Sequence, residues 1–173
     1  MSDVINSFRG EYAFLSNMYP VNIPNRIGIN ITCVEALFQA CKSNNPEDWK
    51  LFDGVDGKTA KIIGRNLTLR EDWDTYRLHV MQKAIDRKFE NKELAEKLLK
   101  TWPKELVEGN NWGDTFWGVC NGRGENHLGK ILMAKRTELF VNQMDEKYNT
   151  WLKANNLEAS EENHLKWLME EDI

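Results

Sequence analysis

An acid, an amide and an amine are spaced so that they share one face of a predicted helix. Glu35, Gln39 and Lys42 recur at positions i, i+4 and i+7, which places them on one stripe at about 100° per residue. The neighbouring stripe, which we expect to face the core, is apolar and consists of Val34, Leu37, Phe38 and Cys41. The polar stripe can line a pocket beside the core and carry acid–base chemistry. It is also typical of a solvated helix face, and Glu35 has capping-box spacing from Thr32, so both interpretations stay open.

A second candidate acid, Asp114, lies in an aromatic segment that is rich in glycine. The segment from Gly109 to Lys130 holds six of the eleven glycines, and three bulky rings accompany them: Trp112, Phe116 and Trp117. Glycine lets the backbone turn tightly or approach a ligand closely, and such loops often carry function. The rings favour a binding loop that stacks a base, with Asp114 as an acid or base. Asp also forms turns by bonding its own backbone, so a purely local role stays open.

Other chemistries find less support in the sequence. Gly124–Lys130 has the G-x-x-x-x-G-K spacing of a phosphate loop, but Ile131 replaces the hydroxyl residue that binds magnesium, which excludes a nucleoside triphosphatase. The same backbone before a helix could still hold a phosphate group, with Arg65 and Arg123 as further candidates. Three cysteines without a C-x-x-C pair and three histidines without ligand spacing indicate no disulfide framework, no metal site and no cofactor.

Several helices must position these residues. Alternating apolar residues from Val21 to Ile31, broken at Pro24, predict a β-hairpin. Caps and apolar spacing predict helices from Val34, from Pro46 to near Gly54, and over 56–65, 72–90, 91–102 and 127–147, with one or two more within 148–171, where Ser160 is a candidate N-cap. The pattern therefore predicts a mainly helical α+β fold with a small antiparallel sheet.

Length and charge divide the 173 residues into a body and a tail. Residues 145–173 carry eight acidic and three basic residues, a net charge of −5, and the remaining 144 residues have a net charge of +1. We expect a domain over 1–144 and an acidic helical extension over 145–173. The near-neutral body disfavours a broad electrostatic grip on nucleic acid. No apolar run approaches the roughly 20 residues that span a bilayer, and no secretory signal is visible, so we expect a soluble cytoplasmic protein without a membrane partner.

Taken in order, residues 6–140 resemble the NADAR family, also called YbiA-like. The matching segments are Phe8–Gly10, Tyr12–Pro20, Val34–Glu35, Phe38–Ala40, Lys42, Gly64–Arg65, Trp73, Val80–Met81, Lys88–Phe89, Leu106–Asn110, Trp112–Asp114, Trp117–Gly118 and Asn126–Lys130. Each fragment alone is a weak signal, whereas the ordered set is specific. One position departs from the family pattern, because Ala36 stands where the family usually has His after Glu35. Activity or substrate choice can differ for that reason.

The resemblance implies an enzyme that hydrolyses an N-glycosidic bond at C1 of a ribose. Family members act on phosphoribosylamino-pyrimidine intermediates of riboflavin synthesis, or remove ADP-ribose from guanine in DNA, often as antitoxins to a DNA ADP-ribosyltransferase. We expect the second activity, with ADP-ribosylated DNA and a cognate toxin as partners. Two other classes stay open: a non-catalytic ADP-ribose reader, and a toxin-neutralising protein that works through its acidic tail.

The resemblance also assigns roles to residues. Glu35, Trp73 and Asp114 match catalytic positions of the family, and Lys42 matches a recurrent lysine. Glu35 would activate water or stabilise the developing cation, Asp114 would be the complementary acid or base, and these two roles are interchangeable. Trp73 would stack on the base, while Lys42 would polarise the sugar, bind phosphate or form a Schiff base. Substrate-binding residues are expected among the matched segments: Phe14, Ser16, Asn17, Tyr19, Gln39, Arg65, Asn110, Trp112, Trp117 and Asn126.

Overall fold

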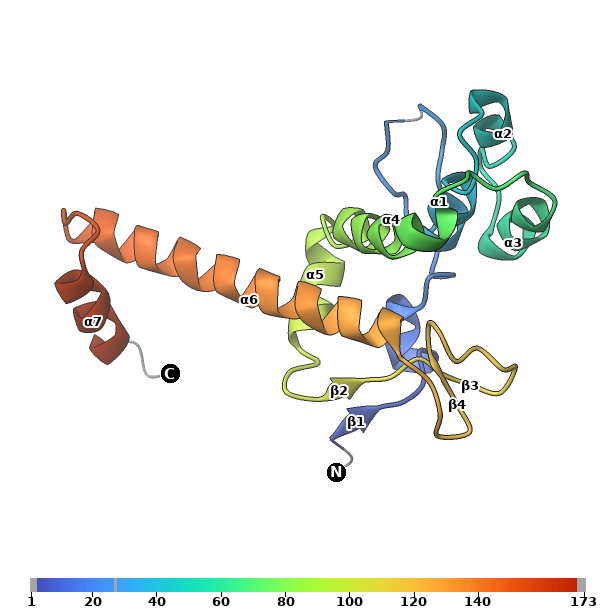
Figure 1. The fold of residues 1–173 in the computed structure, drawn as a ribbon. Coiled ribbons are helices and arrows are strands. Elements are labelled where there is room, and N and C mark those ends of the chain that lie inside the picture. The colour runs from blue at the N-terminus through green and yellow to red at the C-terminus, as the bar shows by residue number, and fades with distance from the viewer. Residues whose placement is uncertain (1–2, 27, 171–173) are drawn as a thin grey trace. The chain divides into compact units, whose positions relative to one another are not determined.

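The computed structural model describes residues 3–26 and 28–170. They form a mainly helical α+β fold with very short strands, as Figure 1 shows, and this confirms the predicted class. The chain divides into two compact units, one up to Lys135 and one from Arg136 onward. The expected boundary at 144/145 falls inside helix α6 (His127–Ala154). Among the described residues, no helix has both the length and the apolar character needed to cross a membrane.

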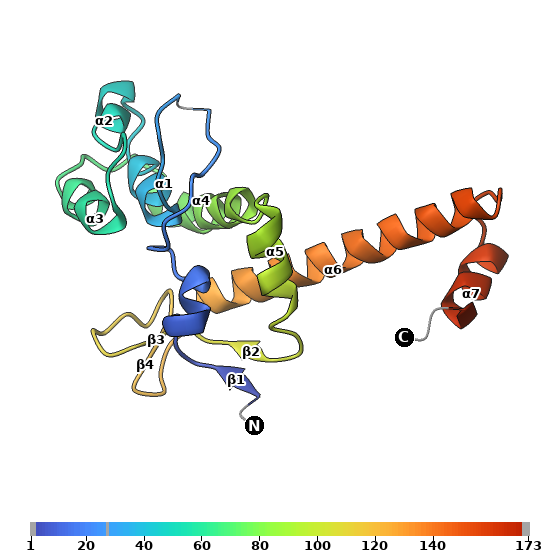
Figure 2. The same ribbon diagram turned by 180° about the vertical axis from the view of Figure 1, so that it is seen from behind.

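Helix α1 (Val34–Ala40) is the centre of the first unit. It packs against α3 (Gly57–Arg65) and α4 (Trp73–Lys88), and the three helices can be followed in Figures 1 and 2. All seven residues of α1 are buried, including Glu35 and Gln39. The polar stripe of this helix is therefore enclosed by neighbouring elements instead of facing bulk solvent.

Side-chain caps fix the starts of three other helices, as the sequence predicts. Each cap accepts a hydrogen bond from a backbone N–H in the first helical turn, an interaction that contributes about 1 kcal/mol. The capped helices are α2 (Pro46–Lys50) by Asn45, α3 by Asp56, and α5 (Lys92–Leu99) by Asn91. The caps place α3 at a defined register along α1.

The capping box expected at the start of α1 is wrong. Cys33 occupies the N-cap position and makes no side-chain cap, while the Thr32 hydroxyl donates to the carbonyl of Val55. The backbone N–H of Glu35 donates instead to the carbonyl of Asn17, at 2.9 Å. A distant segment thus satisfies the helix N-terminus, which leaves the Glu35 carboxylate without a capping role.

The strands pair in parallel, and the expectation of an antiparallel sheet is wrong. β1 (Val4–Ile5) pairs with β2 (Glu105–Leu106), and β3 (Gly109–Asn110) pairs with β4 (Val119–Cys120). Figure 2 shows β1 beside β2 although five helices separate them in the chain. Such distant segments meet through tertiary packing, so no hairpin turn imposes an antiparallel direction.

The predicted hairpin over residues 21–31 is an irregular loop. Two backbone hydrogen bonds join its arms, from Val21 to Thr32 and from Ile23 to Ile31, but no strand forms there among the described residues. The Asn25 side chain closes the loop instead by donating to the carbonyls of Ile23 and Ile29. This amide replaces ladder hydrogen bonds next to Pro24, which has no N–H. Ile27 lies outside the described residues.

The second unit contains the rest of α6 and helix α7 (Glu161–Glu170). Ser160 caps α7 by accepting from the backbone N–H of Asn163 at 3.1 Å, which confirms the predicted cap. Trp167 is 2% exposed, and its ring centroid lies 5.3 Å from that of Tyr148. This unit therefore has a small aromatic core of its own.

Candidate functional site

A cavity of about 330 Å³ in the first unit gathers most of the predicted chemistry. Three carboxylates and two amines line it: Glu35, Glu108, Asp114, Lys42 and Lys61. Two indole rings, Trp112 and Trp117, also line it, together with the polar side chains of Ser16, Asn17 and Gln39. Apolar side chains complete the wall: Met18, Phe38, Met81 and Leu128. Opposite charges thus share a half-buried space with aromatic surfaces, which is typical of a binding or catalytic site.

Glu35 and Gln39 form the wall that α1 contributes. Glu35 is 5% exposed, and its Oε1 accepts a hydrogen bond from Gln39 Nε2 at 2.7 Å. Gln39 fits because α3 carries Gly64 opposite it, where an added Cβ would lie 1.9 Å from Gln39 Oε1. The contact between the two helices therefore sets the orientation of the Glu35 carboxylate.

Lys42 lies just beyond the end of α1 at Ala40, so the helix is shorter than the periodicity predicts, although Lys42 lines the same cavity as Glu35 and Gln39. Burial lowers the pKa of Lys42, the negative charge of Glu35 opposes this change, and the positive charges of Lys61 and Arg65 add to it. The backbone N–H of Arg70 donates to the Lys42 carbonyl at 2.8 Å and so anchors its backbone. Lys42 is thus a held amine with an increased tendency to be neutral.

Asp114 lies at the cavity and also has the local role that its sequence context allows. Its side chain lines the cavity, while its Oδ1 accepts from the backbone N–H groups of Phe116 at 3.1 Å and Trp117 at 2.9 Å. The Asn110 side chain clasps the Asp114 backbone, donating to its carbonyl at 2.7 Å and accepting from its N–H at 3.1 Å. These bonds fix the loop between β3 and β4 that brings Trp117 against Phe38, with centroids 5.4 Å apart.

Glu108 is a carboxylate of the cavity that the sequence analysis did not identify as a site residue. Burial and, to a smaller extent, the nearby charge of Asp114 raise its pKa to about 7, while Lys61, Arg9 and Lys88 act in the opposite direction. Its buried Oε2 has no hydrogen-bond partner among the described residues. The structure therefore contains a carboxyl group that is poised to change protonation near neutral pH.

Lys88 is a second buried ionisable group missed at the sequence level. It is 1% exposed, and its Nζ donates to the Ser16 carbonyl at 2.8 Å. Burial lowers its pKa to about 7, an effect that Cys33 and Glu108 partly oppose. Lys88 does not line the cavity itself. It holds the segment that supplies Ser16 and Asn17 to the wall.

Six other predicted residues lie outside the cavity wall. Trp73 is 7% exposed and packs behind Phe38, with ring centroids 5.0 Å apart, so the structure places it under the site instead of within it. Phe14 is buried in the core, and Tyr19 is a half-buried ring near Lys88. Arg65 is exposed at the end of α3. Asn110 hydrogen-bonds to the backbone of Asp114, and the buried Asn126 accepts from the backbone N–H of Glu108.

Asn126 is buried because its side chain hydrogen-bonds to the backbone of two residues. Its Oδ1 accepts from the backbone N–H of Glu108 at 3.0 Å, and its Nδ2 donates to the Leu106 carbonyl at 2.9 Å. Asn126 adopts a φ of 53°, a conformation that Asn tolerates better than most residues. The residue therefore supports the backbone that carries Glu108, and the substrate-binding role predicted for it stays a prediction.

The phosphate-binding role considered for Gly124–Lys130 is wrong. The backbone N–H groups of residues 125–128 donate to the carbonyls of Thr115, Gly118, Phe116 and Trp117, respectively. Because these donors at the start of α6 are already bonded, they are not free to bind a phosphate group. The segment instead fastens the loop of Asp114 to the helix.

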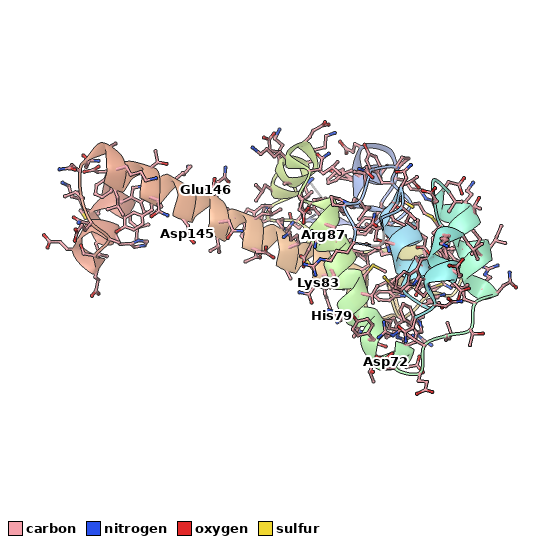
Figure 3. All side chains as sticks on the ribbon, turned by 90° about the horizontal axis from the view of Figure 1, so that it is seen from above. Asp72, His79, Lys83, Arg87, Asp145 and Glu146 are labelled. Carbon is pink, nitrogen blue, oxygen red and sulfur yellow. The ribbon has the colours of Figure 1, made fainter. Side chains whose placement is uncertain are left out.

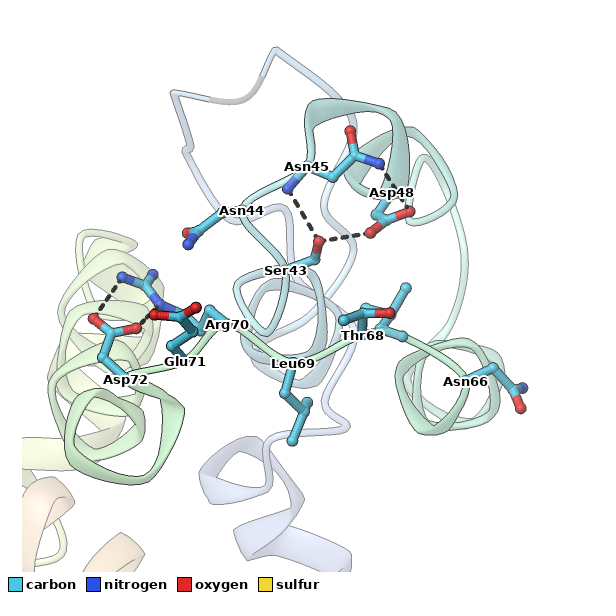
Figure 4. Close-up of a pocket in the computed structure, with 11 residues that line it drawn as sticks. Ser43, Asn44, Asn45, Asp48, Asn66, Thr68, Leu69, Arg70, Glu71 and Asp72 are labelled. Atoms are coloured by element: carbon cyan, nitrogen blue, oxygen red, sulfur yellow. Dashed lines mark hydrogen bonds and ion pairs between the residues drawn. The ribbon is translucent and has the colours of Figure 1, made fainter.

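A larger hollow of about 770 Å³ lies away from these residues and is shown in Figure 4. Its polar side chains bond to one another: Ser43 Oγ donates to Asp48 Oδ2 at 2.6 Å, and Arg70 pairs with Asp72. None of the predicted catalytic residues lines it. Its polar groups are satisfied locally, which favours a structural explanation.

A third hollow of about 350 Å³ runs along α4, where Figure 3 labels His79, Lys83 and Arg87. Two of its cations are paired, Lys83 with Asp86 at 3.7 Å and Arg87 with Glu90 at 3.1 Å. Across the described ranges of the chain, no three His, Cys, Asp or Glu side chains are grouped to hold a metal ion. The cavity that contains Glu35 is therefore the candidate site.

Comparisons with known proteins identify the family to which the chain belongs. The NADAR domain family matches residues 6–140. A Nostoc punctiforme protein named N-glycosidase is 38% identical over 114 residues, which cover 61% of this chain and 72% of that protein. A Vibrio vulnificus protein named riboflavin biosynthesis protein is 35% identical over 137 residues, which cover 75% of this chain but 36% of that protein.

A solved structure gives the same answer for the fold. The NMR structure of the Escherichia coli protein YbiA matches with a TM-score of 0.73 and 32% identity, over 83% of this chain and 89% of that one. The match is consistent with a YbiA-like domain and confirms the family resemblance seen in the ordered segments. Because the family match covers residues 6–140, which is most of the chain, this protein belongs to the NADAR domain family.

Proposed function

We propose that this protein is an N-glycosidase that hydrolyses the bond between C1 of a ribose and a nitrogen. The observation that carries the proposal is the group of three carboxylates and two lysines around one aromatic-walled cavity. Cleavage of a glycosidic bond builds positive charge at C1, which carboxylates stabilise, and also requires a proton for the leaving group. The names of the Nostoc and Escherichia coli relatives are consistent with this reaction.

Glu35 is the residue that we assign to the water or to the cation at C1. The hydrogen bond from Gln39 occupies Oε1 and leaves Oε2 for the substrate side. A carboxylate that accepts this N–H bond is held in a defined orientation, which positions it to act on a water or on the cation. Lys42 adds either a positive charge or, as a neutral amine, a nucleophile that forms a Schiff base with C1 of the opened sugar. Its lowered pKa supports the second role.

For the substrate, we propose removal of ADP-ribose from the amino group of guanine in nucleic acid. The cavity volume of about 330 Å³ is near the lower end for ligand pockets, so it suits the ribosylated amine and leaves the larger groups on both sides outside. Trp112 supports this arrangement, because it lines the cavity and is 57% exposed, which makes its ring accessible for stacking a base.

The second candidate substrate is a phosphoribosylamino-pyrimidine of riboflavin synthesis. The observation in its favour is the name of the Vibrio vulnificus relative. Both substrates present the same ribosyl C1–N bond to Glu35, and they differ in what lies outside the cavity. The two proposed substrates therefore require the same catalytic centre, and a measurement of turnover on each substrate distinguishes between them.

The test incubates the protein with an oligonucleotide that carries ADP-ribose on guanine and follows release by mass spectrometry. We expect release by the wild type and none by Glu35→Gln, whose amide oxygen can still accept from Gln39 and so preserves the fold. Glu71→Gln is the matched control, because Glu71 is exposed and lies at the hollow of Figure 4 instead of the cavity. Turnover of the ribosylamino-pyrimidine alone would select the second substrate. Substantial release by Glu35→Gln would contradict the assignment of Glu35.

A further inference from the structure

We propose that Glu108, and not Asp114, is the acid that gives a proton to the leaving nitrogen, and that Asp114 is a positioning residue. This inference rests on the proposed N-glycosidase function and assigns the acid within the same cavity. Both residues line that cavity together with Glu35. The three carboxylates differ in their hydrogen bonds, and this difference separates their roles.

Asp114 is held as an acceptor by its own loop. Two backbone N–H groups, from Phe116 and Trp117, converge on its Oδ1. This oxygen is therefore already engaged as an acceptor within the loop, which orients the Asp114 side chain. Glu35 also accepts an N–H bond, from Gln39. Each of these two carboxylates thus has an oxygen engaged by N–H donors of the protein.

Glu108 has the opposite environment. Its Oε2 is buried without a hydrogen-bond partner among the described residues, so this oxygen is not engaged by an N–H donor of the protein. Burial and the charge of Asp114 raise the pKa of Glu108 to about 7. A carboxylic acid with a pKa near the working pH is suited to protonating a leaving group. Asp114 thus acts through Glu108, because its fixed negative charge helps to retain the proton.

The charges that surround Glu108 suit both protonation states. Lys61 lines the same cavity from α3, and Arg9 and Lys88 are the other cations that act on Glu108. Once Glu108 has given up its proton, these three positive charges stabilise the carboxylate that remains. The same charges keep the pKa from rising further, so the group can exchange its proton near neutral pH.

In the proposed hydrolysis, Glu108 gives a proton to the leaving nitrogen and Glu35 receives a proton from water. The C1–N bond breaks and its electron pair goes to nitrogen, which receives the proton of the Glu108 carboxyl and leaves as a neutral amine. In direct hydrolysis a water oxygen bonds to C1 and gives its proton to the Glu35 carboxylate. On the Schiff-base route the neutral Lys42 amine first displaces the leaving nitrogen at C1, and water then releases Lys42 from C1 with the same net result. Ribose then carries a hydroxyl at C1, Glu108 is ionised and Glu35 is protonated. Exchange of one proton with solvent at each group restores the starting state.

The test measures kcat/KM from pH 5 to pH 9 with whichever of the two proposed substrates the wild type turns over. We expect the wild-type value to fall about tenfold per pH unit above about pH 7. Glu108→Gln should lower kcat/KM about 10²- to 10⁴-fold at pH 6 and lose this fall, because the titrating acid is gone. Asp114→Asn should keep the fall and move it to lower pH, because a negative charge near Glu108 is removed.

Two results would overturn the inference while leaving the N-glycosidase proposal intact. One is a Glu108→Gln variant that retains the fall above pH 7, and the other is an Asp114→Asn variant that loses it. Absence of turnover on both substrates would instead count against the proposed function. A ¹³C NMR titration of the Glu108 carboxyl in the wild-type protein needs neither turnover nor a folded variant. Titration near pH 7 is the expected result, and titration below pH 5 would contradict the inference.

Discussion

Gln39 donates its side-chain amide to the carboxylate of Glu35 across 2.7 Å, one turn away on the same helix. The other end of that amide, Oε1, is buried without a hydrogen-bond partner among the described residues and faces Gly64 of α3. The orientation of Glu35 therefore depends on how closely α3 approaches α1. Gly64 of α3 can therefore control the geometry of the proposed catalytic carboxylate without touching the substrate.

Gly64→Ala is expected to reduce turnover by displacing Gln39. Alanine favours a helix interior by about 1 kcal/mol over glycine, but its Cβ would lie 1.9 Å from Gln39 Oε1, so the amide must move. We expect kcat to fall at least about tenfold, since small displacements of positioning groups are costly. The double variant Gly64→Ala/Gln39→Ala removes the clash and should regain thermal stability without regaining activity. Full activity in Gly64→Ala would show that the amide has no positioning role.

Substitution of Lys42 distinguishes a fixed charge from a neutral amine. Burial lowers the pKa of Lys42, whereas an arginine at this position would stay charged and could not form a Schiff base. We expect Lys42→Arg to lose about as much activity as Lys42→Met, and borohydride added during turnover to leave a ribosyl adduct on the peptide that contains Lys42. An arginine variant with most of the wild-type activity would assign Lys42 to a purely electrostatic role.

Trp112 is expected to bind the part of the substrate that lies outside the cavity. Stacking of a base on an exposed ring contributes about 1–3 kcal/mol, so Trp112→Ala should raise KM for the modified oligonucleotide about 5- to 100-fold with little change in kcat. Trp102→Ala is a matched control, because Trp102 is 65% exposed and does not line the cavity. Equal effects of the two substitutions would argue against a specific stacking role.

Lys88 should make the stability of the fold depend on pH in a defined direction. Its pKa is about 7 in the folded state, below the ordinary value of 10.5. The unfolded chain therefore binds a proton that the folded chain lacks between those values, and the free energy of unfolding rises with pH by at most about 1.4 kcal/mol per unit. Below pH 7 the folded protein bears the full free-energy cost of burying the charged form of Lys88.

The matched variant for this effect is Lys88→Met, which fills similar space without a charge. Urea unfolding at pH 6, 8 and 9.5 should show wild type gaining stability relative to the variant as pH rises. The lost hydrogen bond to Ser16 lowers the stability of the variant by a similar amount at every pH, so it does not mimic the trend. Parallel pH dependences of the two proteins would contradict the lowered pKa.

Local sequence pattern predicted the part of the site that lies on one helix. Glu35, Gln39 and Lys42 share a face because of helical periodicity, and all three line the cavity. The same pattern gave the wrong account of how the helix begins, because the acceptor for the Glu35 N–H comes from Asn17, in a segment with no pattern of its own. Periodicity reports which residues share a face, and only tertiary packing decides what covers that face.

Glu108 and Lys61 show where sequence reasoning stopped. Each is a single charged residue in an ordinary context, and each acquires significance only from neighbours that are distant in the chain. A signal for Lys61 did exist, because Gly57 and Gly64 lie one turn on either side of it, and small residues mark the face of a helix that approaches another closely. Glu108 lies within the matched segment Leu106–Asn110, but the pattern does not indicate its role, because its properties arise from burial and from the charge of Asp114.

The complete burial of α1 bears on how this enzyme could be re-engineered. All side chains along Val34–Ala40 are buried, so substitutions that change their size disturb packing and will cost folding yield before they alter selectivity. The segment between β3 and β4 offers more freedom, because Trp112 is largely exposed while Asn110 and Asp114 hold the backbone beside it. A library aimed at new leaving groups should therefore randomise positions around Trp112 and keep the buried helix constant.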